Sequence, residues 1–409
     1  MKRLVLYLLA PLLLFCVSGC EWGRGGEIVE TIATPETMMG VDSDTITGTC
    51  GELFWAVNPN TRTLAIWGEG AMPDYEWESA KTRAPWYELG CYWSEYFLFA
   101  QELFDILLID EGVTGIGDYA FCNLQLTHVS LPDSLRTIGE KAFDACELES
   151  LTIQRNVTTI KTGAFARNKF DIFYVSSENQ SFCERDGVLF SKDGKRLVAY
   201  PNRKPGREYI VPNSVKMIDA YAFSQHIYAG DDQYWESIVL PDGLMSIGNS
   251  AFHECRNREN IIFPKSLRII GGNAFAYTNL LEIVIPNGVM ELVDYALKNA
   301  RVQRLALPVS LQAIGEMAID GGILEEIWFS GRPPKVFQFV YGRNWEIIPV
   351  ADDEETPFNV RTYFITVGTD KVPTLYYPRY LASAWAPNGE TTWFGYPIEP
   401  YDELPAWAR

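Results

Sequence analysis

The chain has 409 residues, of which 47% are apolar, and a formal net charge of −19. This length and apolar content suffice for a large buried core. The negative charge argues against nucleic acid as a partner, because binding to a phosphate backbone needs a basic surface. With three histidines and no Cys-x-x-Cys pair, the sequence predicts no zinc site, and it predicts no cofactor.

Residues 1–19 have the layout of a secretory signal peptide, in which a basic pair precedes an apolar run and small residues. The apolar run is too short for a stable membrane span. The ending Val-Ser-Gly-Cys at residues 17–20 resembles the lipobox of a bacterial lipoprotein, which implies cleavage before Cys20 and lipid on that residue. Such lipid would hold the exported protein on a membrane. An ordinary signal peptide followed by a fortuitous cysteine is the alternative.

Residues 20–46 lack apolar periodicity and are predicted to form a flexible tether. Residues 47–112 are predicted to form an N-terminal cap, since the strand-like runs 52–57 and 63–67 flank a turn and indicate a hairpin. Nine aromatic residues then follow between positions 75 and 99. They either bind carbohydrate or cover the open end of a repeat array. We favour the cover, because the terminal repeats of such an array must be capped.

One motif recurs along residues 113–334. Its pattern, Ile-Gly-x-x-Ala-Phe, is first seen at residues 116–121, and most successive copies are 22 residues apart. The repeated isoleucine, replaced once by leucine, is found at Ile116, Ile138, Ile160, Ile218, Ile247, Ile270, Leu292 and Ile314. A repeat of this length predicts a solenoid, here of eight coils.

The residues of each repeat have separate predicted roles. The Ile, Ala and Phe side chains should face the core. Glycine follows the Ile directly in five copies and predicts a tight bend that a side chain would obstruct. An alternating segment before a recurrent proline predicts one short strand per coil, and stacked coils would join these strands in a parallel sheet.

Cysteines are interpreted from their place in the repeats. Cys146 and Cys255 each follow the repeated Phe by three residues, in two different repeats, so we expect two buried core residues rather than a pair. Cys50 and Cys91 both lie in the N-terminal cap. They could form a disulfide or stay as free thiols, and the sequence leaves both possibilities open.

Two insertions and a change of pattern interrupt the array. An Asp-Gly pair between two apolar alternations predicts a protruding hairpin at about residues 176–211. A shorter insertion at residues 226–235 should widen the fourth coil. The motif stops near residue 331, and residues 335–409 are predicted to form a C-terminal cap of mixed short elements.

Several motifs together carry a family resemblance. They are Gly-Thr-Cys-Gly at residues 48–51, Leu-Ala-Ile-Trp-Gly-Glu-Gly-Ala-Met at 64–72, Ala-Pro-Trp at 84–86, the Ile-Gly-x-x-Ala-Phe repeats, and a tail with Leu-Tyr-Tyr-Pro at 375–378. In this order they resemble the BspA-like leucine-rich-repeat proteins of bacterial surfaces. The resemblance implies a β-rich leucine-rich-repeat solenoid with short parallel strands, turns and short helices, capped at both ends. It also implies a lipoprotein of the bacterial outer membrane that is exposed at the surface and, in some members, adheres to host proteins or other cells.

No catalytic constellation is visible. The sequence has no nucleophile elbow, zinc-protease helix, Walker loop or dinucleotide fingerprint. The acidic run at residues 352–355 lacks the ligand spacing of a calcium loop and is interpreted as a solvated turn. We therefore expect a non-catalytic surface protein that binds a protein or glycan of a host or neighbouring cell. A polysaccharide-directed enzyme and a passive surface-layer component stay open as alternatives.

The alternation within the strands predicts where a ligand binds. Residues such as Phe173 and Ile283 should point inward, so the residue after each should point outward and form one row across the coils. An acidic border is expected at Asp171, Glu236, Glu259 and Glu325, with Leu281 and Gln303 between them. The predicted ligand-binding row is Tyr174, Val239, Ile262, Val284, Ala306 and Trp328, preceded by Ser130 and Thr152. An apolar stripe beside charge is typical of an interaction site. Burial of the row by a cap or by the hairpin, or a one-residue error in strand phase, is the alternative.

Overall fold

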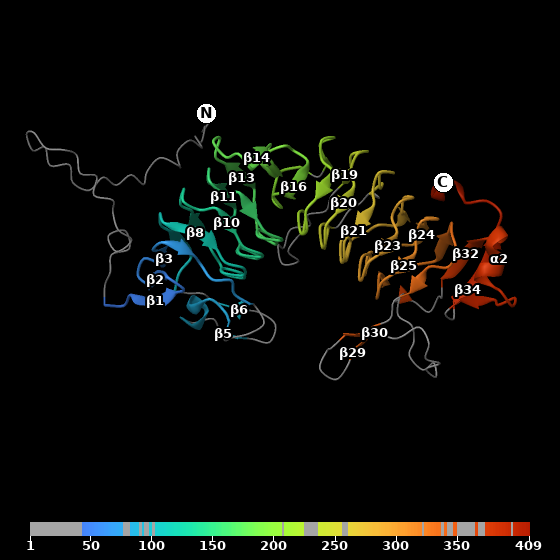
Figure 1. Cartoon of the computed structure of the whole chain (residues 1–409), viewed down its shortest axis with the longest axis horizontal. Coiled ribbons are helices and arrows are strands. Elements are labelled where there is room, and N and C mark those ends of the chain that lie inside the picture. Colours follow the sequence, from blue (N-terminus) through green and yellow to red (C-terminus); the bar gives the residue numbers. More distant parts are fainter. Residues whose placement is uncertain are drawn as a thin grey trace, which may run out of the picture.

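The structure is a computed structural model of the whole chain. It describes residues 43–76, 82–89, 92–93, 98–99, 103–206, 208–224, 236–255, 261–320, 323–336, 339–341, 347–349, 365–366, 373–393 and 396–409. Outside these residues lie the predictions for the signal peptide, Cys20, the tether up to residue 42, Cys91, Glu259 and the segments 226–235 and 352–355. The described residues form an elongated stack of coils with the N-terminal strands at one end and the C-terminal strands at the other (Figure 1).

The N-terminal end is a hairpin that continues into the stack. β1 (Ile46–Cys50), β2 (Leu53–Asn58) and β3 (Thr63–Trp67) pair in antiparallel order, which confirms the predicted hairpin. β3 then pairs in parallel with β7 (Ile106–Ile109), so the same sheet changes from antiparallel to parallel. The hairpin thereby covers one edge of the first coil.

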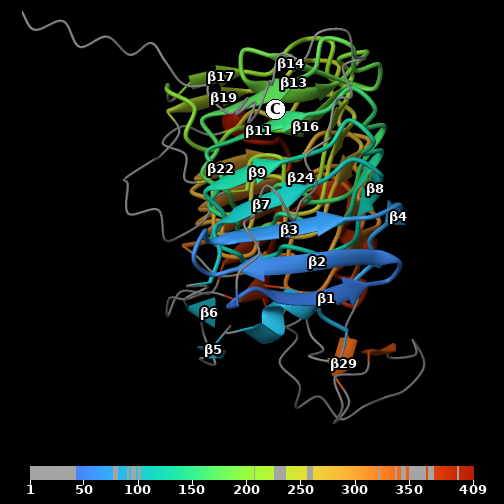
Figure 2. The same cartoon turned by 90° about the vertical axis from the view of Figure 1, so that its left-hand side faces the viewer.

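Most coils contribute two short strands, not the single strand predicted, but residues 261–264 form no strand. One set of strands, several of which precede a proline, forms the long-strand ladder: β7, β9 (His128–Ser130), β11 (Ser150–Ile153), β13 (Ile172–Val175), β17 (Glu208–Ile210), β19 (Ser237–Val239), β22 (Glu282–Val284), β24 (Arg304–Leu307) and β27 (Glu326–Phe329). The strands that end on the repeated residue form the Ile ladder: β8 (Val113–Ile116), β10 (Thr137–Ile138), β12 (Thr159–Ile160), β18 (Met217–Ile218), β20 (Ser246–Ile247), β21 (Ile269–Ile270), β23 (Glu291–Leu292) and β25 (Ala313–Ile314). The paired strands within both ladders are parallel, and the long-strand ladder is interrupted between β9 and β11, between β13 and β17 and between β19 and β22. Viewed from the N-terminal end, β7 and β9 lie across the molecule while β8 lies at its side (Figure 2).

The bend after each Ile strand does not depend on the glycine. The residue three positions after the repeated Ile has a positive φ in every coil, for example 55° at Tyr119 and 62° at Tyr221. The glycine instead allows neighbouring coils to approach, because a Cβ on Gly139 would lie 2.5 Å from the backbone nitrogen of Asp118 in the preceding coil. The predicted role of these glycines in a tight bend is therefore wrong.

The core between the ladders contains two stacks of phenylalanine rings. Neighbouring ring centroids within a stack are 4.8 to 6.3 Å apart. Backbone hydrogen bonds join neighbouring coils beside the rings: the N–H of Phe252, for example, donates to the carbonyl of Ala274 in the next coil at 2.8 Å. The first stack contains Phe121, Phe143 and Phe165, and the second contains Phe223, Phe252 and Phe275. The repeated Ile, Ala and Phe thus face the core as predicted, and Cys146 and Cys255 are buried as expected.

Residues 176–211 contain a hairpin, but it does not protrude. β14 (Phe182–Arg185), β15 (Val188–Ser191) and β16 (Arg196–Ala199) pair in antiparallel order. β16 then pairs in parallel with β18 and so joins the Ile ladder. Both faces of this meander are apolar: Leu189 packs with the N-terminal half of the core, and Phe190 packs with the C-terminal half. The insertion therefore acts as a partition inside the solenoid, because exposing either face would cost hydrophobic burial.

Aromatic side chains outside the repeats close each phenylalanine stack. Trp86, in a short 3-10 helix (Pro85–Leu89), lies 5.2 Å from the Phe121 ring, and its indole N–H donates to the Ala120 carbonyl at 2.9 Å. Tyr200 occupies the equivalent place on Phe223, with centroids 4.9 Å apart. Trp86 therefore acts as part of a cover, as favoured above. The side chains of residues 92, 93 and 99, and residues 77, 96 and 97, are not among those described.

The C-terminal end continues the long-strand ladder. β32 (Thr374–Pro378) pairs in parallel with β27 and with β34 (Tyr396–Tyr401), and β33 (Thr392–Trp393) pairs with β34. A helix, α2 (Ala382–Trp385), carries Trp385, whose indole N–H donates to the Gly331 carbonyl at 2.9 Å. Two more 3-10 turns are Arg379–Leu381 and Ala406–Ala408. The other short strands are β4 (Gly70–Ala71), β5 (Tyr92–Trp93), β6 (Leu98–Phe99), β26 (Ile319–Asp320), β28 (Lys335–Val336), β29 (Phe339–Tyr341), β30 (Ile347–Pro349) and β31 (Ile365–Thr366). No helix of the described residues is long and apolar enough to cross a membrane.

Candidate interaction surface

The strand phase in the long-strand ladder agrees with the predicted alternation. The residues expected to point inward are buried at Leu151, Phe173, Ile238, Ile261, Ile283, Leu305 and Ile327, and Val129 is half-buried. A slip of one residue would have exposed all of them. The residues after them therefore point away from the core.

Four of the six predicted row residues are exposed. Ile262 is 82% exposed, Tyr174 50%, and Val239 and Val284 are exposed as well. Ser130 and Thr152 also lie on the surface, at the polar N-terminal end of the row. A fifth apolar residue belongs with them, because Ile210 pairs in register with Val239 and is 71% exposed. We call Tyr174, Ile210, Val239, Ile262 and Val284 the apolar row.

Ile210 was missed although the sequence carried a signal for it. Ile210 precedes Pro212 by two residues, which is the spacing that separates Val239 from Pro241. The insertion obscured this match, because Ile210 lies outside the 22-residue period. The outward-facing residue at Ile210 is therefore indicated by the proline two positions later, and not by the 22-residue period of the motif.

The C-terminal end of the predicted row is not part of the exposed surface. Ala306 is only 3% exposed, and Trp328 is half-buried. The Trp328 ring stacks on Tyr376 at 4.1 Å and lies 5.2 Å from Tyr401, both in the C-terminal strands. The expectation that Ala306 is exposed is therefore wrong, since it is buried between Val284 and Trp328 on the neighbouring strands. Trp328 is only partly exposed, because the C-terminal strands pack against it.

The expected acidic border is exposed where the structure describes it. Asp171, Glu236 and Glu325 are all exposed. Each of them directly precedes the first residue of a long strand, namely β13, β19 and β27 in turn. Glu208, the first residue of β17, is an exposed acid that the sequence analysis did not include. Leu281 is exposed and Gln303 is half-buried. The starts of β13, β17, β19 and β27 thus carry exposed acids, and the first three of these strands contain residues of the apolar row.

A second group of exposed apolar side chains lies on the Ile ladder and was not predicted. Ile269 is 59% exposed, and Met217, Met245 and Met290 are exposed in neighbouring coils. Met217 and Ile269 lie directly before the repeated isoleucines Ile218 and Ile270, which are buried, so alternation turns them outward. This group competes with the apolar row as an interaction surface.

A groove of about 540 Å³ lies where the two halves of the solenoid meet. Residues 160–166 form one wall, and residues 217–222 form the other. Among its charged residues, Arg196 Nη2 lies 2.6 Å from Asp219 Oδ2, and Lys161 Nζ lies 2.9 Å from Asp118 Oδ1. Glu140 also lines the groove and accepts a hydrogen bond from the Tyr119 hydroxyl at 3.4 Å. With one of its two lining carboxylates held by Arg196, the groove does not present the pair of available carboxylates that glycosidase chemistry uses.

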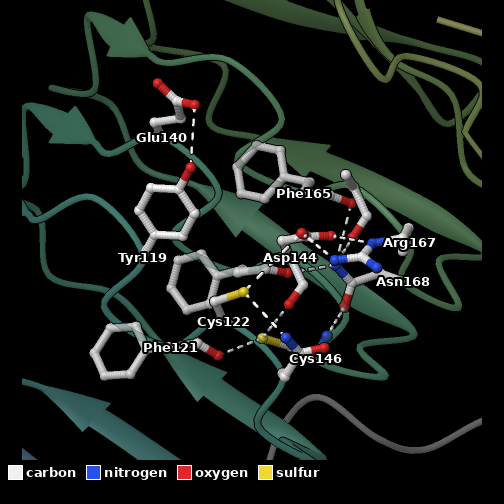
Figure 3. Close-up of polar contacts among 12 residues, drawn as sticks. Tyr119, Phe121, Cys122, Glu140, Asp144, Cys146, Phe165, Arg167 and Asn168 are labelled. Atoms are coloured by element: carbon white, nitrogen blue, oxygen red, sulfur yellow. Dashed lines mark hydrogen bonds and ion pairs between the residues drawn. The ribbon is translucent and has the colours of Figure 1, made fainter. Parts of the chain in front are cut away.

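A buried polar network holds the turns of the second and third coils together (Figure 3). The carboxylate of Asp144 accepts two hydrogen bonds from Arg167, at 2.8 and 2.5 Å. Asn168 accepts the backbone N–H of Cys146 at 3.1 Å and donates to the carbonyl of Phe143 at 2.6 Å. Burial raises the pKa of the Cys122 and Cys146 thiols, so both stay protonated and unreactive. The network is structural, and sequence reasoning did not find it.

The described thiols and carboxylates elsewhere give no sign of a metal centre or a redox pair. Among the described residues, no group of three or more His, Cys, Asp or Glu side chains could hold a metal ion. Cys50 is a buried free thiol, and burial raises its pKa to about 11. Cys91 is outside the described residues, so the possible Cys50–Cys91 disulfide stays a prediction.

Comparison with protein families identifies the repeat. A sequence profile described as the BspA type leucine rich repeat region matches residues 95–185 and 202–322, in six copies. These segments make up more than half of the chain. The protein belongs to the BspA-type leucine-rich-repeat family. As a member of this repeat family it has the expected β-rich solenoid fold with short parallel strands.

Solved structures of bacterial leucine-rich-repeat proteins are similar to this BspA-type chain. The pneumococcal vaccine antigen PcpA is 17% identical, with a TM-score of 0.51, and the match covers 88% of this chain and 99% of that one. A leucine-rich repeat protein from Eubacterium ventriosum is 20% identical, with a TM-score of 0.45 and coverage of 74% and 99%. A leucine rich cell surface protein from Faecalibacterium prausnitzii is 20% identical, with a TM-score of 0.44 and coverage of 70% and 95%. No curated protein matches the chain.

Proposed function

We propose that this BspA-type protein is exported, anchored by lipid to the bacterial outer membrane, displayed at the cell surface, and binds a partner protein through the apolar row without catalysis. The observation that carries the proposal is the exposure of five large apolar side chains at equivalent positions of the coils, four of them in strands of the long-strand ladder. Aligned exposed apolar side chains are costly in water unless a partner covers them. The name of the Faecalibacterium protein, a cell surface protein, supports display at the surface.

A protein partner fits the apolar row better than a glycan. Four of its five side chains are aliphatic, so they offer no hydrogen bond to a sugar hydroxyl. Burying hydroxyl groups against them without such bonds is unfavourable. The single exposed ring, Tyr174, lies at the end of the row and cannot form a stacking platform by itself.

The substitution Ile262→Lys tests the proposed surface. A partner from a panel of host matrix and cell-surface proteins should bind the variant at least about 10-fold more weakly, because a charge would be buried in the contact. Binding is measured by surface plasmon resonance, and a circular dichroism melt checks that the variant is folded. The matched control is Ile269→Lys, the same change on an exposed residue of the Ile ladder.

The pair of variants separates the possible outcomes. Loss of binding in Ile269→Lys alone would move the site to the Ile ladder. Unchanged binding in both variants would contradict an apolar contact surface. Product formation from a polysaccharide panel would favour the enzyme alternative, and a protein that binds no member of either panel would favour a passive surface component.

The lipid anchor has its own test. We expect Cys20→Ala to release the protein from the membrane fraction, because acyl chains on Cys20 would provide the anchoring free energy. Cys16→Ala is the control, since residue 16 lies in the predicted leader and its loss should change nothing. Metabolic labelling with palmitate and membrane fractionation are the measurements. Retention of Cys20→Ala in the membrane would refute the anchor.

A further inference from the structure

We propose that the partner element bound by the apolar row is an amphipathic α-helix with one basic flank, which lies along the long-strand ladder. This inference rests on the proposed function and specifies its ligand. The structural basis is the combination of exposed β-branched side chains in neighbouring coils with exposed acids at the starts of the strands that contain Ile210 and Val239.

The spacing of Ile210 and Val239, which lie opposite each other on paired strands, fits a helix. Side chains on adjacent strands of a ladder are about 4.8 Å apart, whereas those on one face of a helix recur about every 5.4 Å. A helix inclined by about 27° to the row would bring the two spacings into register. In an extended peptide the same-face residues are about 6.7 Å apart, which requires a much steeper crossing and leaves most of the row uncovered.

The stiffness of the row favours binding. Ile210, Val239, Ile262 and Val284 are all β-branched, so their side chains have few rotamers to lose. A surface that is already ordered keeps the entropic cost of association low. Leucine, methionine or phenylalanine side chains of a helix at i, i+3, i+4 and i+7 could pack between these branched residues.

The charges place the basic flank on one side. Glu208 begins the strand that contains Ile210, and Glu236 directly precedes the strand that contains Val239. Both acids are exposed, as is Asp171 before β13. On the other side of the row, exposed Lys265 follows Pro264. Complementary charge would therefore orient the helix with its basic residues toward the strand starts.

The two ends of the row limit the length of the helix. Trp328 is stacked on Tyr376 and closes the C-terminal end. Ser130 and Thr152 make the N-terminal end polar.

Designed peptides test this inference with the full chain. A fluorescent helical peptide of about 18 residues would carry leucine at i, i+3, i+4 and i+7 spacing and lysine on one flank. One control peptide distributes the same leucines around the helix, and a second replaces lysine by glutamate. Fluorescence anisotropy should show binding that is at least about 10-fold weaker for both controls, and the lysine-to-glutamate difference should shrink in high salt.

Variants of the chain locate the contact. We expect Ile262→Ser to weaken binding of the lysine peptide at least about 10-fold, and Ile269→Ser to change it less than about 2-fold. Equal binding of the peptide with redistributed leucines would overturn the helix proposal, because it would reveal attraction by charge alone. Concentration-dependent dimerisation that Ile262→Ser abolishes would overturn it as well, in favour of a second copy of the chain.

The experiments can refute the proposed helical ligand and the proposed binding surface independently of each other. If Ile262→Lys weakens a partner from the protein panel but the full chain does not bind the lysine peptide, the proposed function stands and the helix is wrong. If neither the panel nor the peptide responds to changes at Ile262, both proposals are wrong.

Discussion

Replacing Trp86 by alanine should lower the free energy of unfolding by about 3–5 kcal/mol. Trp86 is almost fully buried and packs on Phe121, the first ring of the N-terminal stack. Its indole N–H also donates a hydrogen bond to the carbonyl of Ala120. In later coils the equivalent carbonyl accepts a backbone N–H of the preceding coil, as Ala142 accepts that of Phe121, and the first coil has no such neighbour. The alanine variant loses the ring and leaves this buried carbonyl without its partner, so both effects act in the same direction.

Urea denaturation followed by circular dichroism measures the effect. Trp86→Phe should be less destabilised than Trp86→Ala, because it keeps an aromatic ring on Phe121 and loses only the indole hydrogen bond. Tyr380→Ala, at an exposed position, is the control for a change of similar size. Hydrogen exchange in Trp86→Ala should rise mainly in the N-terminal half, because the partition at β14–β16 separates the two cores. Wild-type stability in Trp86→Ala would show that Trp86 does not close the stack.

A methyl group at Gly117 should destabilise the protein by about 3 kcal/mol. A Cβ on this residue would lie 1.7 Å from the carbonyl oxygen of Pro73, which belongs to the backbone and cannot rotate away. Hydrogen bonds hold the two segments together, including Met72 N–H to the Gly115 carbonyl at 2.9 Å. The segment around Pro73 must therefore separate from the first coil or distort both backbones.

Gly243→Ala is the matched control for Gly117→Ala. Its Cβ would meet the Nζ of Lys216 at 2.1 Å, but that atom is the end of a flexible side chain and can move. We expect the Gly117 variant to melt several degrees below the wild type and the Gly243 variant to melt close to it. Similar melting of the two variants would contradict the docking of residues 72–75 on the first coil.

The limits of sequence reasoning can be seen at particular glycines. Five copies of Gly after the repeated Ile indicated that a side chain is excluded there, which is correct at Gly117 and Gly139. The cause is a contact with an earlier segment, Pro73 for Gly117 and the preceding coil for Gly139, and not the local bend, so it is invisible in one repeat. Lys161 and Asp219 occupy the same position in other coils, and coil contacts therefore differ along the array.

The sequence by itself determined the eight coils and the phase of their long strands. The reason is that both signals are local: a coil is set by its own 22 residues, and a strand exposes alternate residues whatever its neighbours are. The phase correctly placed Ile262 and Val239 on the surface and Phe173 in the core.

Only the tertiary structure decided which outward residues stay uncovered. Trp328 has the correct phase, but a strand more than 40 residues further along the chain packs beside it. Ala306 is buried between its partners Val284 and Trp328 on the neighbouring strands. The insertion at β14–β16 reads as a protruding hairpin because its local turn signal is strong, yet its two apolar faces find partners only when both halves of the solenoid are present. Burial depends on contacts between segments distant in sequence, and a local pattern carries no information about those contacts.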